Sequence, residues 1–196
     1  MSVTNMNLSW RANIWTAVAL VVALQSAALI WMIAGRISLL KSGREMIAEV
    51  VPVDPRDLFR GEYVVLGYSF SSTGDTTLPS GTKRGDRVYA TLKSGEGNKW
   101  DLVSVAPAYP EKIEPGQAVL SGIASDVWLN SEKGLAKGRI RYGIETYFVP
   151  QGKGRELETM VRDKKIEAVL AVSDIGQAAI KALVIDGKRV HEEPLF

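Results

Sequence analysis

The chain contains no cysteine and only one histidine among its 196 residues, and this excludes several kinds of site. Without cysteine there is no disulfide framework and no thiolate ligand for a metal ion. The single histidine, His191, leaves the usual zinc sites and Cys–His dyads without enough ligands. A Ser–His–acid triad would depend on this one residue near the C-terminus, where segments often fray, so we expect no such triad.

An excess of one charge sign is also lacking. The 24 basic and 22 acidic residues leave a net charge of +2. Residues 1–35 contain a single charged side chain, Arg11, so the remainder carries 23 basic and 22 acidic residues, a net charge of +1. This near-neutral remainder lacks the basic surface that a phosphate backbone requires, and we expect no nucleic-acid binding.

One long apolar run stands near the N-terminus, where "IWTAVALVVALQSAALIWMIA" covers Ile14 to Ala34 without a charge. As a helix, these 21 residues extend about 31 Å, close to the bilayer core of about 30 Å. Tryptophans flank both ends, as is typical of membrane interfaces: Trp10, Trp15 and Trp31. The run predicts a transmembrane helix at 14–35 after a short tail at 1–13.

A cleaved signal peptide is the alternative to a retained anchor. The apolar run is long for a signal peptide and no clear small-x-small cleavage motif follows it, so we expect an anchor. Arg36, Lys41 and Arg44 after the run outnumber Arg11 before it, which by itself favours a cytoplasmic domain. That rule weakens for long following segments, and we expect the domain on the extracytoplasmic side.

After a linker at 36–46, period-two patterns predict a β domain at 47–196. In "GRIRYGIETYFVP", alternate residues share one face: Ile140, Tyr142, Ile144, Thr146 and Phe148. The opposite, outward face carries Arg139, Arg141, Glu145 and Tyr147. In "DRVYATLK" the inward residues are Val88, Ala90 and Leu92.

Further strands are predicted at Ile47–Val53, Tyr63–Phe70, Lys99–Val105, Ala118–Ile123, Lys165–Val172 and Ala179–Ile185. Gly- and Pro-rich turns separate them. In "GRELETMVRDKK", Leu157, Met160 and Val161 have helical spacing and predict one helix over 154–165. The fold class is therefore mainly β (α+β): a transmembrane helix followed by an antiparallel barrel- or sandwich-like domain with one helix.

The stretch "DPRDLFRGEYVVLGY" has two interpretations. In the structural one, Asp54 caps a helical turn that Pro55 begins and Gly61 ends, and a strand follows. Gly67 then marks a bulge or a close backbone approach. In the functional one, acids and arginines surround a polar binding site, whose candidate residues are Asp54, Arg56, Asp57, Arg60, Glu62, Tyr63 and Tyr68. Charged residues in turns are usually capping or solvated, which favours the first.

A second candidate binding region surrounds "QGKGRELE". Lys153 and Arg155 stand at the start of the predicted helix, where an anion can bind. The neighbouring strand adds Arg141 and Glu145 from its outward face. A lipid headgroup, a glycan or a peptide end would suit these groups.

A membrane-tethered hydrolase is the enzymatic alternative, with carboxylates such as Asp57 and Glu62 or with a Ser–Lys pair. A signal-peptidase-like mechanism needs a serine just beyond the anchor and a lysine in an apolar environment. Ser38 and Ser42 have the first position, and Lys181 in "AAIKALVI" has the second. The methionine-proline context of such a serine is missing, and a single lysine in a strand more often faces solvent.

"GEYVVLGY" at 61–68 resembles the motif that names the GDYXXLXY family of bacterial membrane-anchored proteins. "PVDPRDLFR" and "RYGIETYFVPQGKGRELE" are similar to that family's other signature stretches. Motif residues on this basis are Gly61, Leu66 and Gly67. Glu62 stands where the motif has aspartate, and its extra methylene favours a structural role for this acid. The resemblance implies the bacterial inner membrane and a membrane-protein partner, without a known activity.

We therefore expect a single-span anchored β domain that binds or assembles with another envelope component, most simply a membrane protein. Neither a cofactor nor a metal ion is expected, and no catalysis. The hydrolase is the alternative.

Overall fold

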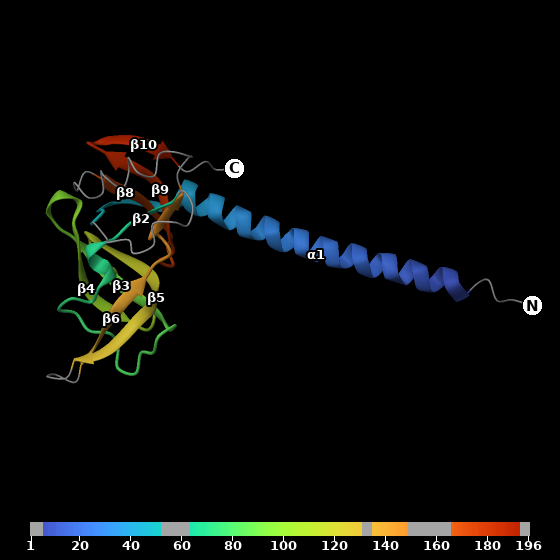
Figure 1. Ribbon diagram of the computed structural model, residues 1–196, viewed down its shortest axis with the longest axis horizontal. Coiled ribbons are helices and arrows are strands. Elements are labelled where there is room, and N and C mark those ends of the chain that lie inside the picture. The colour runs from blue at the N-terminus through green and yellow to red at the C-terminus, as the bar shows by residue number, and fades with distance from the viewer. Residues whose placement is uncertain (1–5, 52–62, 131–134, 149–165, 193–196) are drawn as a thin grey trace, which may run out of the picture. The chain divides into compact units, whose positions relative to one another are not determined.

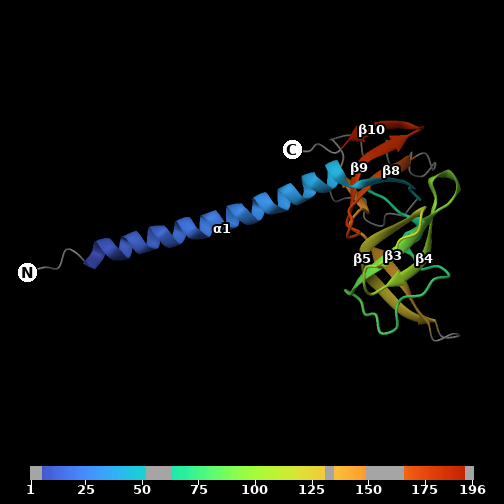
Figure 2. The same cartoon turned by 180° about the vertical axis from the view of Figure 1, so that it is seen from behind.

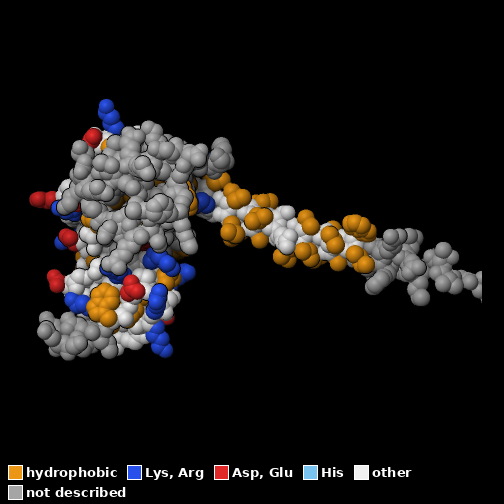
Figure 3. All heavy atoms as spheres, in the orientation of Figure 1, with side chains coloured by type: hydrophobic (Ala, Val, Ile, Leu, Met, Phe, Trp, Pro, Cys, Tyr) orange, Lys and Arg blue, Asp and Glu red, His pale blue; other side chains and the backbone are white. Residues whose placement is uncertain are grey.

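The computed structural model describes residues 6–51, 63–130, 135–148 and 166–192, and it divides into two compact units, residues 1–38 and 39–196. Helix α1 runs over Met6–Ser42 and supplies the first unit. Its apolar side chains are exposed along Ile14–Ile33 (Figure 3). The segment from Ile14 to Ser42 is long and apolar enough to cross a membrane, a property that an N-terminal signal sequence shares.

The second unit contains two four-stranded antiparallel sheets and a two-stranded ribbon (Figure 1). Sheet I has the order β1 (Arg44–Glu49), β8 (Ile166–Val172), β9 (Ala178–Ile185), β10 (Lys188–Glu192). Sheet II has the order β4 (Trp100–Ala106), β3 (Arg87–Ser94), β5 (Gln117–Asn130), β6 (Leu135–Arg141). The ribbon pairs β2 (Tyr63–Val65) with β7 (Thr146–Phe148). Viewed from either side, sheets I and II occupy opposite ends of this unit (Figures 1 and 2).

Sheet II curls into a half-barrel, and residues 69–78 form hydrogen bonds with both of its outer strands, β4 and β6. This segment begins with the short 3₁₀ turn η1 (Ser69–Ser71). The Thr76 hydroxyl donates to the carbonyl of Leu102 in β4 at 2.9 Å, and the amide of Leu78 donates to the carbonyl of Ala136 in β6 at 2.8 Å. Because both edges find partners here, the segment closes the open side of the sheet.

Both sheets and the 69–78 segment contribute to one hydrophobic core. Leu120 and Ile140 from sheet II and Leu170 and Leu183 from sheet I are almost completely buried in it. The alternation predicted for 86–93 is confirmed in β3, since Val88, Ala90 and Leu92 are all buried. Burial of this apolar surface is the main force that holds the sheets together.

The sequence prediction of a mainly β domain after one apolar helix is confirmed, but the strand bounds differ. The predicted strand at 138–150 is interrupted, because Gly143 adopts a positive φ of 82° between β6 and β7. Ile140, Tyr142 and Ile144 are buried as predicted, but the alternation is reversed in β7. Thr146 and Phe148, both assigned to the inward face, are exposed, and Tyr147, assigned to the outward face, is buried. Those three assignments were wrong.

Four other differences concern the bounds of the helix and strands or an additional strand. The strand predicted at Tyr63–Phe70 covers only Tyr63–Val65, and β5 is much longer than the predicted Ala118–Ile123, with a bulge between Ala124 and Asp126. β1 begins at Arg44 and α1 ends at Ser42, within the range predicted as a linker. The backbone of His191 lies in β10, a strand that was not predicted, and not on a frayed end. The helix predicted over 154–165 lies outside the described residues.

Candidate functional site

Two tyrosines from distant parts of the sequence meet in the core at the end of the 61–68 motif. Tyr68 stacks on Phe70 with ring centroids 5.2 Å apart, and Phe70 meets the edge of Tyr142 at 5.5 Å. The Tyr68 hydroxyl donates to the carbonyl of Ile144 at 3.1 Å, and the Tyr142 hydroxyl donates to the carbonyl of Phe70 at 3.0 Å. We call Tyr68, Phe70 and Tyr142 the aromatic cluster.

Burial raises the pKa of both hydroxyls well above the usual value for tyrosine, and the nearby Glu145 carboxylate raises the pKa further. Both groups therefore remain protonated and act as hydrogen-bond donors to the backbone. Their partners are buried carbonyl oxygens, which are costly to leave without a donor. The aromatic cluster thus joins the motif at 61–68 to the stretch at 141–148 and serves the fold.

Glu145 holds the turn between β6 and β7. Its carboxylate accepts hydrogen bonds from the amides of Tyr142 at 2.6 Å and Gly143 at 2.9 Å. Its own carbonyl accepts from the amide of Leu66 at 2.8 Å. A carboxylate that is engaged in this way positions backbone atoms and is not offered to a ligand.

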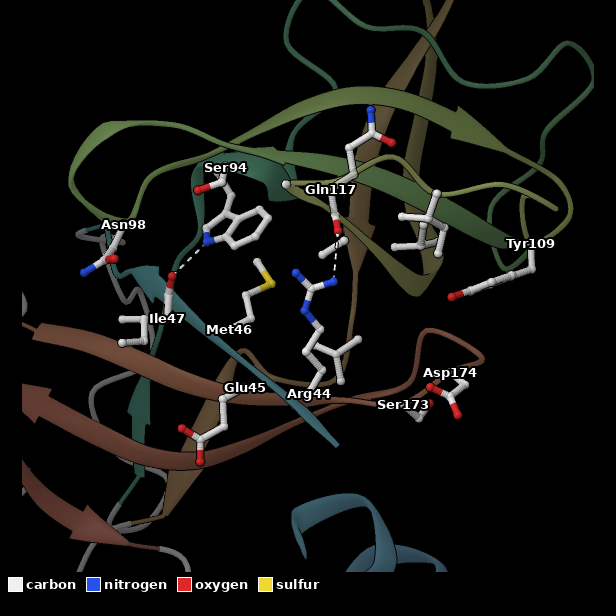
Figure 4. Close-up of a pocket in the computed structure, with 16 residues that line it drawn as sticks. Arg44, Glu45, Met46, Ile47, Ser94, Asn98, Tyr109, Gln117, Ser173 and Asp174 are labelled. Atoms are coloured by element: carbon white, nitrogen blue, oxygen red, sulfur yellow. Dashed lines mark hydrogen bonds between the residues drawn. The ribbon is translucent and has the colours of Figure 1, made fainter. Parts of the chain in front are cut away.

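A cleft of about 390 Å³ opens between the two sheets, lined by β1, the β3–β4 turn, the loop before β5 and the β8–β9 turn (Figure 4). We call it the inter-sheet cleft. On one side, the Trp100 indole N–H donates to the Ile47 carbonyl at 2.8 Å. On the other side, the Ser121 amide donates to the Gly176 carbonyl at 2.7 Å. Two hydrogen bonds from sheet II to sheet I thus hold its two sides.

Arg44 is the basic side chain that lines the inter-sheet cleft. It occupies the same side of β1 as the buried Met46, and its guanidinium points toward Gln117 between the sheets (Figure 4). Its Nη1 lies 3.5 Å from the Gln117 carbonyl oxygen, a long hydrogen bond. Within the described ranges, no carboxylate forms an ion pair with Arg44.

Aromatic and apolar side chains surround this charge. Trp100 forms one wall, and Tyr109 lies at the other side, where its ring packs edge-on against Tyr89 at 5.7 Å. Partial burial, followed by the charge of Asp174, raises the pKa of the Tyr109 hydroxyl. The combination of one cation with aromatic and aliphatic walls suits a ligand that has both an anionic and an apolar part.

Comparison with known protein families matches residues 25–183 to the family described as GDYXXLXY protein. The chain belongs to the GDYXXLXY family. No curated protein and no solved structure matches it. The match covers most of the chain, from within α1 into β9, and β10 lies beyond it.

The GDYXXLXY motif itself lies only partly among the described residues. Leu66 is buried in the core, and Gly67 accepts a hydrogen bond from the Val51 amide at 2.9 Å, the close backbone approach that the sequence suggests. Tyr63 begins β2. The remaining candidates lie outside the described residues: Asp54, Arg56, Asp57, Arg60, Gly61, Glu62, Lys153 and Arg155.

The other predicted binding residues do not lie together in one site. Tyr68 and Glu145 support the core and the turn, and Arg141 is exposed at the end of β6. None of these three residues lines the inter-sheet cleft. Sequence reasoning did not select Arg44 as a candidate, because a basic residue beside a long apolar helix is normally counted toward membrane orientation.

Lys181, the lysine considered for a Ser–Lys pair, lies in an ion pair. Its ammonium donates to the Glu45 carboxylate at 2.7 Å, and Arg189 contacts the same carboxylate at 2.6 Å. These hydrogen bonds lower the pKa of Glu45. The base of a Ser–Lys pair is directed at its serine, whereas the Lys181 amino group is directed at the Glu45 carboxylate. Within the described ranges, no three His, Asp or Glu side chains lie close enough to share a metal ion.

Replacing Glu145 by alanine is expected to lower the free energy of unfolding by about 1–3 kcal/mol, because two amides of the β6–β7 turn lose a charged acceptor. Urea titration of the detergent-solubilised chain, followed by near-UV circular dichroism, measures this. Glu145→Gln keeps one acceptor oxygen and should lose less. If both variants retain full stability, Glu145 does not hold the turn.

Proposed function

We propose that this protein is a single-span membrane-anchored binding module of the bacterial inner membrane, with its β unit on the extracytoplasmic side. Its function is to bind another envelope component, a membrane protein, through the inter-sheet cleft. The proposal needs no catalytic step.

The observation that carries this proposal is Arg44 in the inter-sheet cleft. The side chain of Arg44 is exposed to solvent at the mouth of the cleft, so its guanidinium is accessible to a ligand. Arg44 has only a long bond to a carbonyl within the described residues. The family membership and the apolar helix α1 support a membrane context for the partner.

A photo-crosslinking amino acid at Ile113, an exposed residue that lines the cleft, is expected to capture this partner in native membranes. The captured protein should have membrane-spanning segments of its own, because the proposal places the partner in the bilayer. Gel mobility and mass spectrometry identify the adduct.

The matched control places the same amino acid at Val103, an exposed aliphatic residue of β4 that does not line the cleft. A specific partner gives an adduct at Ile113 and little at Val103. The proposal fails if neither position gives a membrane-protein adduct, or if the two give the same adducts in equal amounts.

A further inference from the structure

We propose that the inter-sheet cleft binds the carboxyl terminus of a polypeptide. The terminal carboxylate lies on Arg44, and the last side chain lies against the apolar wall. This inference rests on the proposed function, since it names the part of the partner that enters the cleft.

The guanidinium of Arg44 has the geometry for this task. It presents N–H donors in a planar fork that matches the two oxygens of a carboxylate. Only one of these donors is engaged with Gln117, at 3.5 Å, and the head group points into the open space between the sheets (Figure 4). A carboxylate in that space would exchange one long neutral bond for two charged ones.

The acids that line the cleft do not neutralise Arg44. Glu45 follows it in β1 and therefore projects from the opposite side of the strand, where Lys181 and Arg189 bind its carboxylate. Asp174 is exposed in the β8–β9 turn and acts on Tyr109. Arg44 thus supplies a positive charge inside the cleft, and the charge complementarity favours an anion.

The polar side chains that line the cleft are largely engaged with the protein itself. The Gln117 side chain bonds to the Glu114 amide at 3.2 Å, the Asn98 amide group to Glu167 at 3.0 Å, and the Ser173 hydroxyl to the Gln177 amide at 3.0 Å. Arg44 is therefore the group that would bind the charged part of a ligand. The rest of the ligand would contact apolar side chains.

The apolar wall beside Arg44 consists of the buried side chains of Met46, Val119 and Val172 together with the half-buried Trp100. At about 390 Å³, the cleft is near the lower end of the range for ligand sites, which favours a chain end over a long extended segment. One carboxylate directly next to one apolar side chain is the chemistry of a C-terminal apolar residue.

The same chemistry occurs in a free small carboxylate, so the test separates the sources. The full chain in detergent micelles is titrated against fluorescein-labelled tripeptides Ala-Ala-X, where X is Leu, Ile, Val, Phe or Met, and fluorescence anisotropy reports binding. We expect the peptides with a free carboxylate to bind at least about tenfold more tightly than the same peptides with a C-terminal amide. Binding should weaken as sodium chloride is raised from 0.05 to 0.5 M.

Two variants assign the effect to the cleft. Arg44→Gln should weaken binding of the free-carboxylate peptides by about tenfold and remove their advantage over the amides. Arg141→Gln removes an exposed arginine of β6 outside the cleft and should bind like the original chain. Unchanged near-UV circular dichroism of both variants shows that folding is retained.

Competitors complete the test. Unlabelled Ala-Ala-Leu should displace the probe, whereas octanoate and inorganic phosphate should need at least about tenfold higher concentrations, because octanoate has no side chain next to its carboxylate and phosphate has no apolar part. Equal competition by either of these two overturns the assignment to a polypeptide end, as does equal binding of acid and amide, or no peptide binding. If these results occur while the Ile113 adduct persists, only this inference fails; loss of the adduct removes the proposed function itself.

Discussion

Replacing Phe70 with alanine is expected to lower the free energy of unfolding of the β unit by about 3–5 kcal/mol. Phe70 is 2% exposed and lies between the rings of Tyr68 and Tyr142. Its removal leaves a cavity in the core and takes away the ring contacts of both tyrosines, whose hydroxyls bond to the backbone. The segment at 69–78 that closes sheet II would lose its main anchor in the core.

Urea titration of the detergent-solubilised full chain measures this effect, with near-UV circular dichroism as the signal from packed aromatic rings. Phe148→Ala is the matched control, because this phenylalanine is 77% exposed on β7, and its loss should cost less than about 1 kcal/mol. Equal effects of the two substitutions would show that the aromatic cluster does not organise the core.

Gly138→Ala is expected to destabilise the β unit by about 1–3 kcal/mol or more, although it adds a single methyl group. A Cβ on Gly138 would collide with the carbonyl oxygen of Asp126 in β5 and would approach Leu78 Cδ1 at 2.7 Å. The Gly138 carbonyl accepts a hydrogen bond from the Thr73 amide, and the Gly138 amide donates one to the Thr73 hydroxyl. These two bonds fix the position of the Gly138 backbone. The clash with backbone cannot be relieved by a rotamer change.

A matched control is Gly95→Ala, where the nearest atom to the added Cβ is the Lys99 carbonyl oxygen at 3.4 Å. That position should change the urea midpoint little, since the contact is an ordinary one. If Gly138→Ala unfolds at the same urea concentration as the original chain, then β5 and β6 separate more easily than their hydrogen bonds suggest.

The fold class and the strands with regular alternation could be predicted from the sequence. In β3, for example, Val88, Ala90 and Leu92 differ from their neighbours in polarity, and period two then defines the buried face. The positive φ of Gly143 could not be predicted, because glycine also occurs within strands. The strand is broken at this turn, and the predicted burial of Thr146, Tyr147 and Phe148 is reversed in β7.

The candidate site was harder to predict than the fold. Tyr68 and Glu145 look like binding residues in sequence because both are polar and lie in signature stretches, yet their partners are backbone groups about 76 and 3 residues away. Arg44 has no distinctive neighbours in sequence. Arg44 lines a cleft only because β5 and the β8–β9 turn, which are distant in sequence, lie next to β1 in the fold. Local sequence patterns do not predict such long-range contacts.

Pairing between β1 and β8 joins Arg44 to Val172 and Glu49 to Glu167, so the strand that follows the helix most closely has its partner more than a hundred residues later. During synthesis at about 5–20 residues per second, β1 waits on the order of ten seconds with both of its edges unsatisfied. A nascent chain in this state offers hydrogen-bonding groups to any neighbouring strand. A chain truncated before residue 166 lacks this partner strand, so it should be degraded or should aggregate and not persist as a shorter folded form.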